Sequence, residues 1–150
     1  MLQTLNYKTM KILCLAGLVT SVLALGGGVS RDQADAKLVL ACQKGVEYLL
    51  DDYSMIKSIK QTNFSNIANK MDGDRRVVMD VVVDENYLEI DKTFSCNFFE
   101  NRGLMGMNYS ANLAQIDMGD GDVYGRKDDQ ILGGMNKWLN ITKEVEAYLD

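Results

Sequence analysis

The chain has 150 residues, 47% of them hydrophobic, and its 16 basic and 21 acidic residues give a net charge of −5. This acidic balance disfavours nucleic acid and anionic membrane surfaces as partners, because both repel an excess of carboxylates. The chain has no histidine, which excludes Ser-His-Asp and Cys-His catalytic arrangements and removes the commonest general base near neutral pH.

The first 36 residues have the pattern of an export signal. Lys8 and Lys11 precede residues 12–25, which are fourteen residues without a charge. A run of this length fits the apolar core of a signal peptide, of roughly 7 to 15 residues, better than a membrane span of about 20. We therefore expect an extracytoplasmic protein, periplasmic or secreted.

Two small-x-small triplets could direct cleavage, Ala24-Leu25-Gly26 and Ala34-Asp35-Ala36. We place the cut after Ala36, because it releases Lys37 at the start of a helical pattern, and keep the cut after Gly26 as the alternative. Met10 is a second candidate for the true start of the protein.

An uncleaved membrane anchor is the competing interpretation of this leader. Residues 12–29 form an apolar run of eighteen residues, near the lower limit for a membrane helix. Gly26, Gly27 and Gly28 each weaken a helix by about 1 kcal/mol, which favours cleavage. Because the positive charges precede the run, both interpretations place the body of the protein outside the cytoplasm.

Residues 37–150 have the size of a single domain. They contain two cysteines, Cys42 and Cys96, 54 positions apart. In an oxidising compartment such a pair is most simply a disulfide, and closing a loop of this length is worth about 4 kcal/mol on the chain-entropy model.

A helix is predicted first, over residues 37–53. Its apolar residues recur every three or four positions: Leu38, Cys42, Val46, Leu49, Leu50 and Tyr53. This spacing makes an amphipathic helix with Cys42 on its buried side. We expect the helix to extend through residues 54–61, and a short strand with Phe64 in the core to follow at residues 62–69.

A turn at residues 71–74, which contains Asp72-Gly73, then leads into a strand rich in valine at residues 77–83. Residues 84–86 form the next turn, and a second long strand follows. Its apolar residues alternate and share one face: Leu88, Ile90, Phe94, Cys96 and Phe98. Because Cys96 lies on that face, the disulfide should join the helix to the sheet.

A third long strand is predicted after the turn at residues 101–103, with Met105, Met107, Tyr109, Ala111 and Leu113 in alternation. A final helix is predicted over residues 128–149, with Asp128 and Asp129 at its start as N-cap residues. The fold class is therefore α+β: a leader helix, a helix, a three- to four-stranded antiparallel sheet and a C-terminal helix.

Aspartates crowd the segment before that last helix, and four of them are candidate cation ligands: Asp117, Asp120, Asp122 and Asp128. An EF-hand starting at Asp120 fails at two ligand positions, which hold Tyr124 and Ile131. A turn rich in glycine and aspartate is the favoured interpretation. We expect no metal and no cofactor.

A carboxylate-dependent hydrolase is a further alternative, because Asp84, Glu85, Glu89 and Asp91 lie close together in the sequence. These residues belong to a turn and to the predicted solvent face of a strand, where charges are usually just solvated. We expect no catalytic residues.

Four segments together resemble a class of small secreted or periplasmic bacterial proteins of unassigned function: Ala41-Cys42, residues 58–64, residues 81–86, and Phe94-Ser95-Cys96-Asn97-Phe98. In that class a helix cysteine pairs with a strand cysteine in a Cys-x-Phe motif. The resemblance implies a fold and a disulfide, and no activity.

The function that the sequence favours is that of an exported, non-catalytic binding protein. It would bind a protein or a component of the cell envelope through its sheet face or its acidic loop. The alternative is a single-pass, membrane-anchored accessory subunit of an envelope complex, which requires that the leader is retained.

Overall fold

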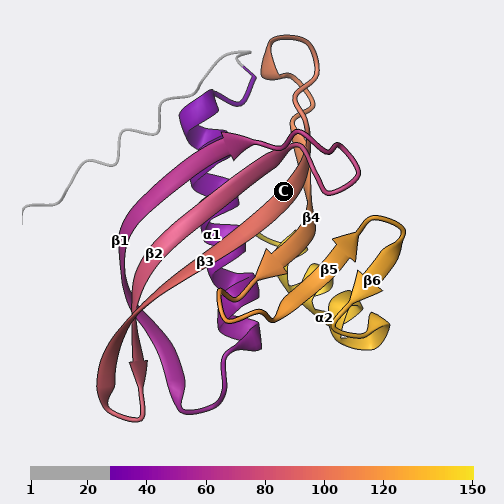
Figure 1. Ribbon diagram of the computed structural model, residues 1–150. Coiled ribbons are helices and arrows are strands. Elements are labelled where there is room, and N and C mark those ends of the chain that lie inside the picture. Colours follow the sequence, from indigo (N-terminus) through magenta and orange to yellow (C-terminus); the bar gives the residue numbers. More distant parts are fainter. Residues whose placement is uncertain (1–27) are drawn as a thin grey trace, which may run out of the picture.

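A computed structural model describes residues 28–150, which fold into one antiparallel sheet and two helices (Figure 1). The α+β class is confirmed, but the sheet has six strands instead of three or four. The elements are α1 (Arg31–Leu49), β1 (Ser54–Asn66), β2 (Arg75–Glu85), β3 (Leu88–Asn101), a 3-10 helix (Leu104–Gly106), β4 (Ser110–Asp117), β5 (Val123–Lys127), β6 (Gln130–Leu132) and α2 (Met135–Glu146). Each strand pairs with the next along the chain. The predicted leader helix lies outside the described residues.

The core lies between the sheet and the two helices. The long strands β1, β2 and β3 curve across α1, and α2 lies beside β5 and β6 (Figure 1). The largest fully buried side chains come from both layers: Leu38 and Val46 of α1, Met79 of β2, Phe94 and Phe98 of β3, Ile116 of β4, and Ile141 of α2. None of the helices within residues 28–150 is long and apolar enough to cross a membrane.

The disulfide between Cys42 and Cys96 is confirmed, and it joins α1 to β3. Both cysteines are completely buried, and their Cα atoms lie 5.7 Å apart. The predicted helical and strand periodicities therefore each placed one cysteine on the correct side of its element.

The first helix begins at Arg31, six residues before the predicted start, and ends at Leu49. Ser30 caps it: the Ser30 hydroxyl accepts a hydrogen bond from the Gln33 backbone N–H, and the Gln33 side chain accepts one from the Ser30 N–H. This reciprocal capping box fixes the start of the helix. Tyr53, predicted on the buried side of the helix, lies beyond its end and is 77% exposed.

Residues 54–61 form the first half of β1, so the predicted extension of the helix was wrong. Two irregularities in the pairing with β2 explain the error. The register shifts between Ile56 and Ser58 and again between Ile59 and Gln61. Each shift inserts one extra residue in β1, so the inward-facing Ile56 and Ile59 are three positions apart, a spacing that is typical of a helix.

The predicted final helix was also too long. Residues 123–132 form the hairpin of β5 and β6, and Asp128 and Asp129 lie in its turn. Gly133 and Gly134 both have positive φ, and α2 begins only after them. The part that remains helical buries Trp138, Ile141 and Val145.

The third predicted strand was too long at its start, because β4 begins only at Ser110 and residues 104–106 form the 3-10 helix. In β3, Phe94, Cys96 and Phe98 are buried as predicted. Leu88 and Ile90 share their face but are 66% and 38% exposed. The hairpin of β2 and β3 projects past the end of α1, so this part of the face has no helix over it (Figure 1).

Candidate binding surfaces

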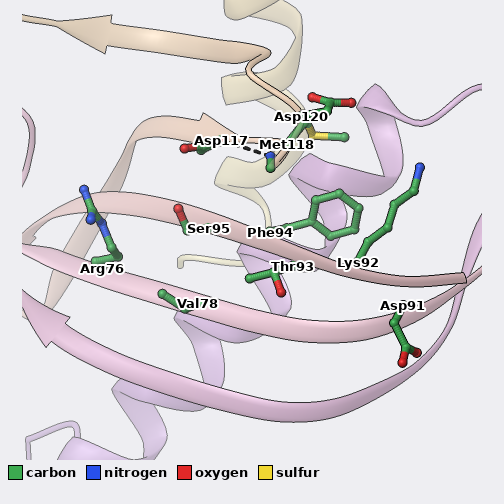
Figure 2. A pocket seen from close by; sticks show the side chains of 11 residues that line it. Arg76, Val78, Asp91, Lys92, Thr93, Phe94, Ser95, Asp117, Met118 and Asp120 are labelled. Carbon is green, nitrogen blue, oxygen red and sulfur yellow. Dashed lines mark hydrogen bonds between the residues drawn. The ribbon is translucent and has the colours of Figure 1, made fainter.

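The open face of the sheet carries a hollow of about 570 Å³ between β2, β3 and the loop that follows β4. We call it the sheet hollow; its lining includes Arg76, Val78, Thr93, Ser95, Asp117 and Asp120. Figure 2 shows Arg76 and Lys92 at opposite ends of it. The sheet face and the acidic loop, predicted as two separate binding surfaces, therefore adjoin in one place.

Several polar groups around the sheet hollow already have partners within the protein. Thr93 Oγ1 donates a hydrogen bond to Asp80 Oδ1 at 2.7 Å. Lys92 Nζ lies 2.7 Å from Glu85 Oε2, and Lys60 Nζ lies 2.6 Å from Asp91 Oδ1. Most small-molecule sites have a few polar groups that point toward the ligand. In the sheet hollow such groups already bond to other groups of the protein.

A ladder of side-chain hydrogen bonds crosses four strands next to the sheet hollow. Arg76 Nε donates to Asn97 Oδ1 at 2.9 Å, and Asn97 Nδ2 donates to Gln115 Oε1 at 3.1 Å. Gln115 Nε2 in turn donates to the backbone oxygen of Arg126 at 3.0 Å. Asn97 is only 3% exposed, so the ladder satisfies a buried amide and stabilises the sheet.

The four candidate cation ligands do not converge. Asp117 Oδ1 accepts a hydrogen bond from the Gly119 N–H at 2.8 Å, and Asp120 Oδ1 accepts one from the Asp122 N–H at 3.2 Å. These are local turn contacts. Asp128 lies in the other turn, between β5 and β6. Within residues 28–150, no three cysteine, aspartate or glutamate side chains are placed to hold a metal ion.

The carboxylates considered for hydrolysis lie along the β2–β3 hairpin, and three of them face lysines. Glu85 lies against Lys92 as described, Glu89 is paired with Lys57, and Asp91 with Lys60. Asp84 and Glu89 are cross-strand neighbours on the sheet surface. This arrangement is that of solvated surface ion pairs, which contribute little to stability.

A second surface lies at the tip of the β2–β3 hairpin, next to the loop that enters β1. Its three apolar side chains are Tyr53, 77% exposed, Met55, 62%, and Tyr87, 99%, which line one hollow together. We call these three residues the tip surface. The Asn86 backbone N–H donates a hydrogen bond to the backbone oxygen of Tyr53 at 3.2 Å, so the two loops are held side by side. Contiguous exposed apolar groups of this kind mark interaction sites.

Tyr87 has an unusual backbone conformation. Asn86 and Tyr87 form the two-residue loop between the paired residues Glu85 and Leu88, and their φ angles are +53° and +67°. Two-residue hairpin loops with positive φ favour Asn followed by Gly, because a side chain at the second position is strained. A tyrosine here costs backbone stability, and its ring is almost wholly in solvent.

The tip surface has an acidic border. A shallow hollow of about 260 Å³ between the two loops is lined by Tyr53, Met55 and Tyr87 together with Asp52 and Asp84. We call it the tip hollow. Tyrosine rings and carboxylates together attract a cation, through cation–π and Coulombic interactions respectively.

The sequence analysis missed the tip surface, because it placed Tyr53 on the buried face of the first helix. The available signal was Asn86-Tyr87, a loop in which tyrosine occupies the usual position of glycine.

Comparison with protein-family models, with curated proteins and with solved structures finds no match.

Proposed function

We propose that the protein is an exported, non-catalytic interaction domain that binds a partner protein through the tip surface. The observation that carries this proposal is Tyr87, a strained and fully exposed aromatic residue that lines the tip hollow together with Tyr53 and Met55. Strain of this kind persists where function requires it, and tyrosine is enriched at the centres of protein interfaces. Export is supported by the leader sequence and is compatible with the disulfide.

The charge around the tip surface indicates what kind of partner fits. Asp52 and Asp84 line the tip hollow, and Asp51 adjoins it in the sequence. Lys57 of β1 and Lys92 of β3 already face glutamates. The tip therefore presents net negative charge around apolar rings, and a protein surface with lysine or arginine beside an apolar contact complements it.

Capture from an envelope extract tests the proposal. The mature exported protein is immobilised in parallel with Tyr87→Gly, Asp84→Asn and Leu104→Ser, the last of which changes a residue that is 83% exposed and lies outside the tip surface. We expect one partner that binds to the wild type and to Leu104→Ser but not to Tyr87→Gly. Asp84→Asn should release this partner at a lower salt concentration than the wild type does. Equal capture by all four proteins would refute the role of the tip.

A further inference from the structure

Residues 29–36 are an integral part of the folded domain. The Val29 N–H donates to the Gly106 oxygen at 3.1 Å. Gly106 has φ +75°, and a Cβ on it would lie 2.6 Å from the Val29 oxygen, so its lack of a side chain lets this segment approach. Ser30 caps α1, and the helix begins at the next residue.

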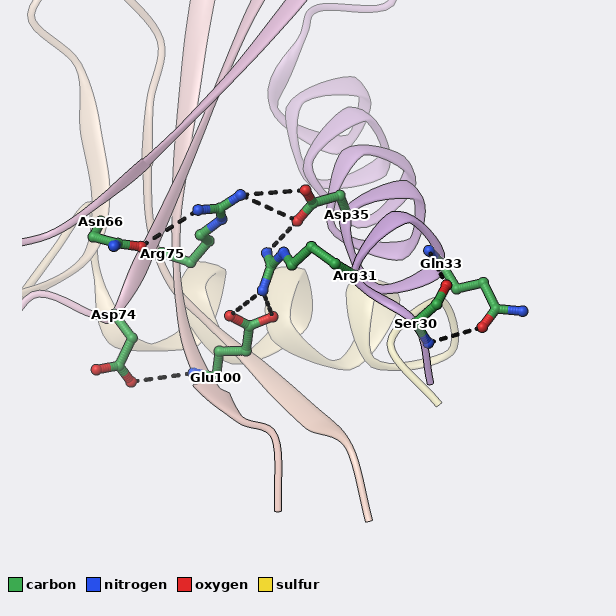
Figure 3. Close-up of polar contacts among 8 residues, drawn as sticks. All are labelled: Ser30, Arg31, Gln33, Asp35, Asn66, Asp74, Arg75 and Glu100. Atoms are coloured by element: carbon green, nitrogen blue, oxygen red, sulfur yellow. Dashed lines mark hydrogen bonds and ion pairs between the residues drawn. The ribbon is translucent and has the colours of Figure 1, made fainter. Parts of the chain in front are cut away.

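An ion cluster then ties the first turns of α1 to the sheet (Figure 3). Arg31 Nη1 donates to both oxygens of Glu100, at 2.8 and 2.9 Å, and Arg31 Nη2 contacts Asp35. Arg75 Nη2 of β2 donates to Asp35 Oδ2 at 3.2 Å. The Glu100 side chain is only 8% exposed. Burial alone would lower the pKa of Arg31, but hydrogen bonds to Asp35 and Glu100 outweigh it and raise that pKa.

A cut after Ala36 would remove most of these contacts. Ala34 is completely buried, and the triplet Ala34-Asp35-Ala36 lies inside α1. A chain that starts at Lys37 lacks the capping box, the Val29 hydrogen bond and the cation that faces Glu100. A buried carboxylate left without its cation is strongly destabilising. The folded domain thus needs its residues from Val29 onward.

We propose that the processing site of this protein is the Gly26–Gly27 peptide bond, cut by a signal peptidase. Water is added across that bond, which leaves a carboxylate on Gly26 and an ammonium group on Gly27. The triplet Ala24-Leu25-Gly26 supplies the small residues that such a peptidase requires, immediately after the apolar run. The mature chain then starts two residues before Val29 and keeps every contact described above.

This inference rests on the proposed export, and one experiment separates the two. The full 150-residue chain is produced in a Gram-negative bacterial host, and its intact mass, N-terminal sequence and thiol content are measured after fractionation. Gly26→Tyr is designed to block the proposed site. Ala36→Leu is the matched control, because Ala36 is exposed on α1 and a leucine there keeps the helix.

We expect a periplasmic product that starts at Gly27, has no free thiol, is unchanged in Ala36→Leu and accumulates as precursor in Gly26→Tyr. A product that starts at Lys37, or a precursor that accumulates only in Ala36→Leu, would overturn the inference. A full-length product with an oxidised disulfide outside the cytoplasm would also overturn it, while leaving export intact. A reduced, cytoplasmic product would refute both proposals.

Discussion

At the scale of single residues, Tyr87 couples stability to binding. Its φ of +67° suits glycine, and its ring is 99% exposed, so the folded domain gains little from the side chain. Replacing it with glycine should raise the free energy of unfolding by about 1 kcal/mol, because the backbone strain is relieved. Urea unfolding followed by the fluorescence of Trp138, together with capture of the partner, should show a more stable protein that no longer binds.

Tyr53→Ser is the matched control for that result. It removes the other exposed ring of the tip surface from a residue whose φ is not positive. It should weaken binding without raising stability. A Tyr87→Gly protein that is less stable than the wild type would mean that the ring contributes to folding, and the argument from strain would fail.

Gly125 in β5 is required for a close contact. Its φ is +105°, and a Cβ there would lie 2.5 Å from the Ala114 oxygen and 2.7 Å from the Trp138 ring. Gly125→Ala should lower the free energy of unfolding by about 2 to 4 kcal/mol, through strain and overpacking together. Gly121 has a similar φ of +100° with open space around it, so Gly121→Ala should cost only about 1 kcal/mol. Equal losses in urea unfolding would contradict the packing argument.

Tyr109 should limit stability at alkaline pH. Burial, followed by the charge of Glu100, raises its pKa above the usual 10.0. Below pH 10.0 the phenol is neutral whether the chain is folded or unfolded. The contribution of Tyr109 to the free energy of unfolding is therefore fully present there. At higher pH the unfolded chain loses the proton first, and stability falls. Tyr109→Phe should show a shallower decline when the free energy of unfolding is measured from about pH 9 to 11.

The hydroxyl of Tyr109 is buried without a hydrogen-bond partner among the described residues. Its removal should therefore leave stability near neutral pH unchanged or slightly higher. Parallel alkaline declines for the wild type and the phenylalanine variant would show that another group controls this pH range.

At the scale of elements, the disulfide holds α1 against β3. Its two cysteines are 54 positions apart, so the double variant Cys42→Ala/Cys96→Ala should lower the free energy of unfolding by about 4 kcal/mol. Replacing both residues avoids a free thiol. Chemical reduction of the wild type should give a loss of similar size, and a loss below about 1 kcal/mol in both experiments would show that packing alone holds the two layers together.

The central part of the fold could be predicted from the sequence because its patterns are regular. In β2 the buried residues alternate without interruption from Val77 to Val83, and in β3 the apolar residues Phe94, Cys96 and Phe98 alternate with polar ones. The helical spacing around Cys42 is equally regular. Cys42 lies on the helical pattern and Cys96 on the strand pattern. The contact between the helix and the sheet could therefore be predicted from these two residues.

The outer strands could not be predicted in the same way, because their patterns are broken. Two register shifts give β1 a helical spacing, and β5 and β6 are too short to show alternation. The tip surface was missed for a different reason. Tyr53 continues the helical spacing of Leu38, Cys42 and Val46, and only the three-dimensional arrangement shows that α1 ends before it.

At the scale of the whole molecule, the two proposals concern opposite ends. The start of α1, with its ion cluster, lies at one end of that helix, and the tip of the β2–β3 hairpin projects past the other (Figure 1). Residue 28, the first that the structure describes, is therefore remote from the tip surface.

Site-specific photo-crosslinking from residue 87 shows whether a partner protein contacts the tip surface. p-Benzoylphenylalanine replaces Tyr87 in the full chain exported by its native host, and the same amino acid at Leu104 serves as the control. We expect one discrete protein adduct from position 87, which weakens when Asp84→Asn is added and does not form from position 104. The absence of an adduct at 87, or the same adducts from both positions, would contradict this expectation.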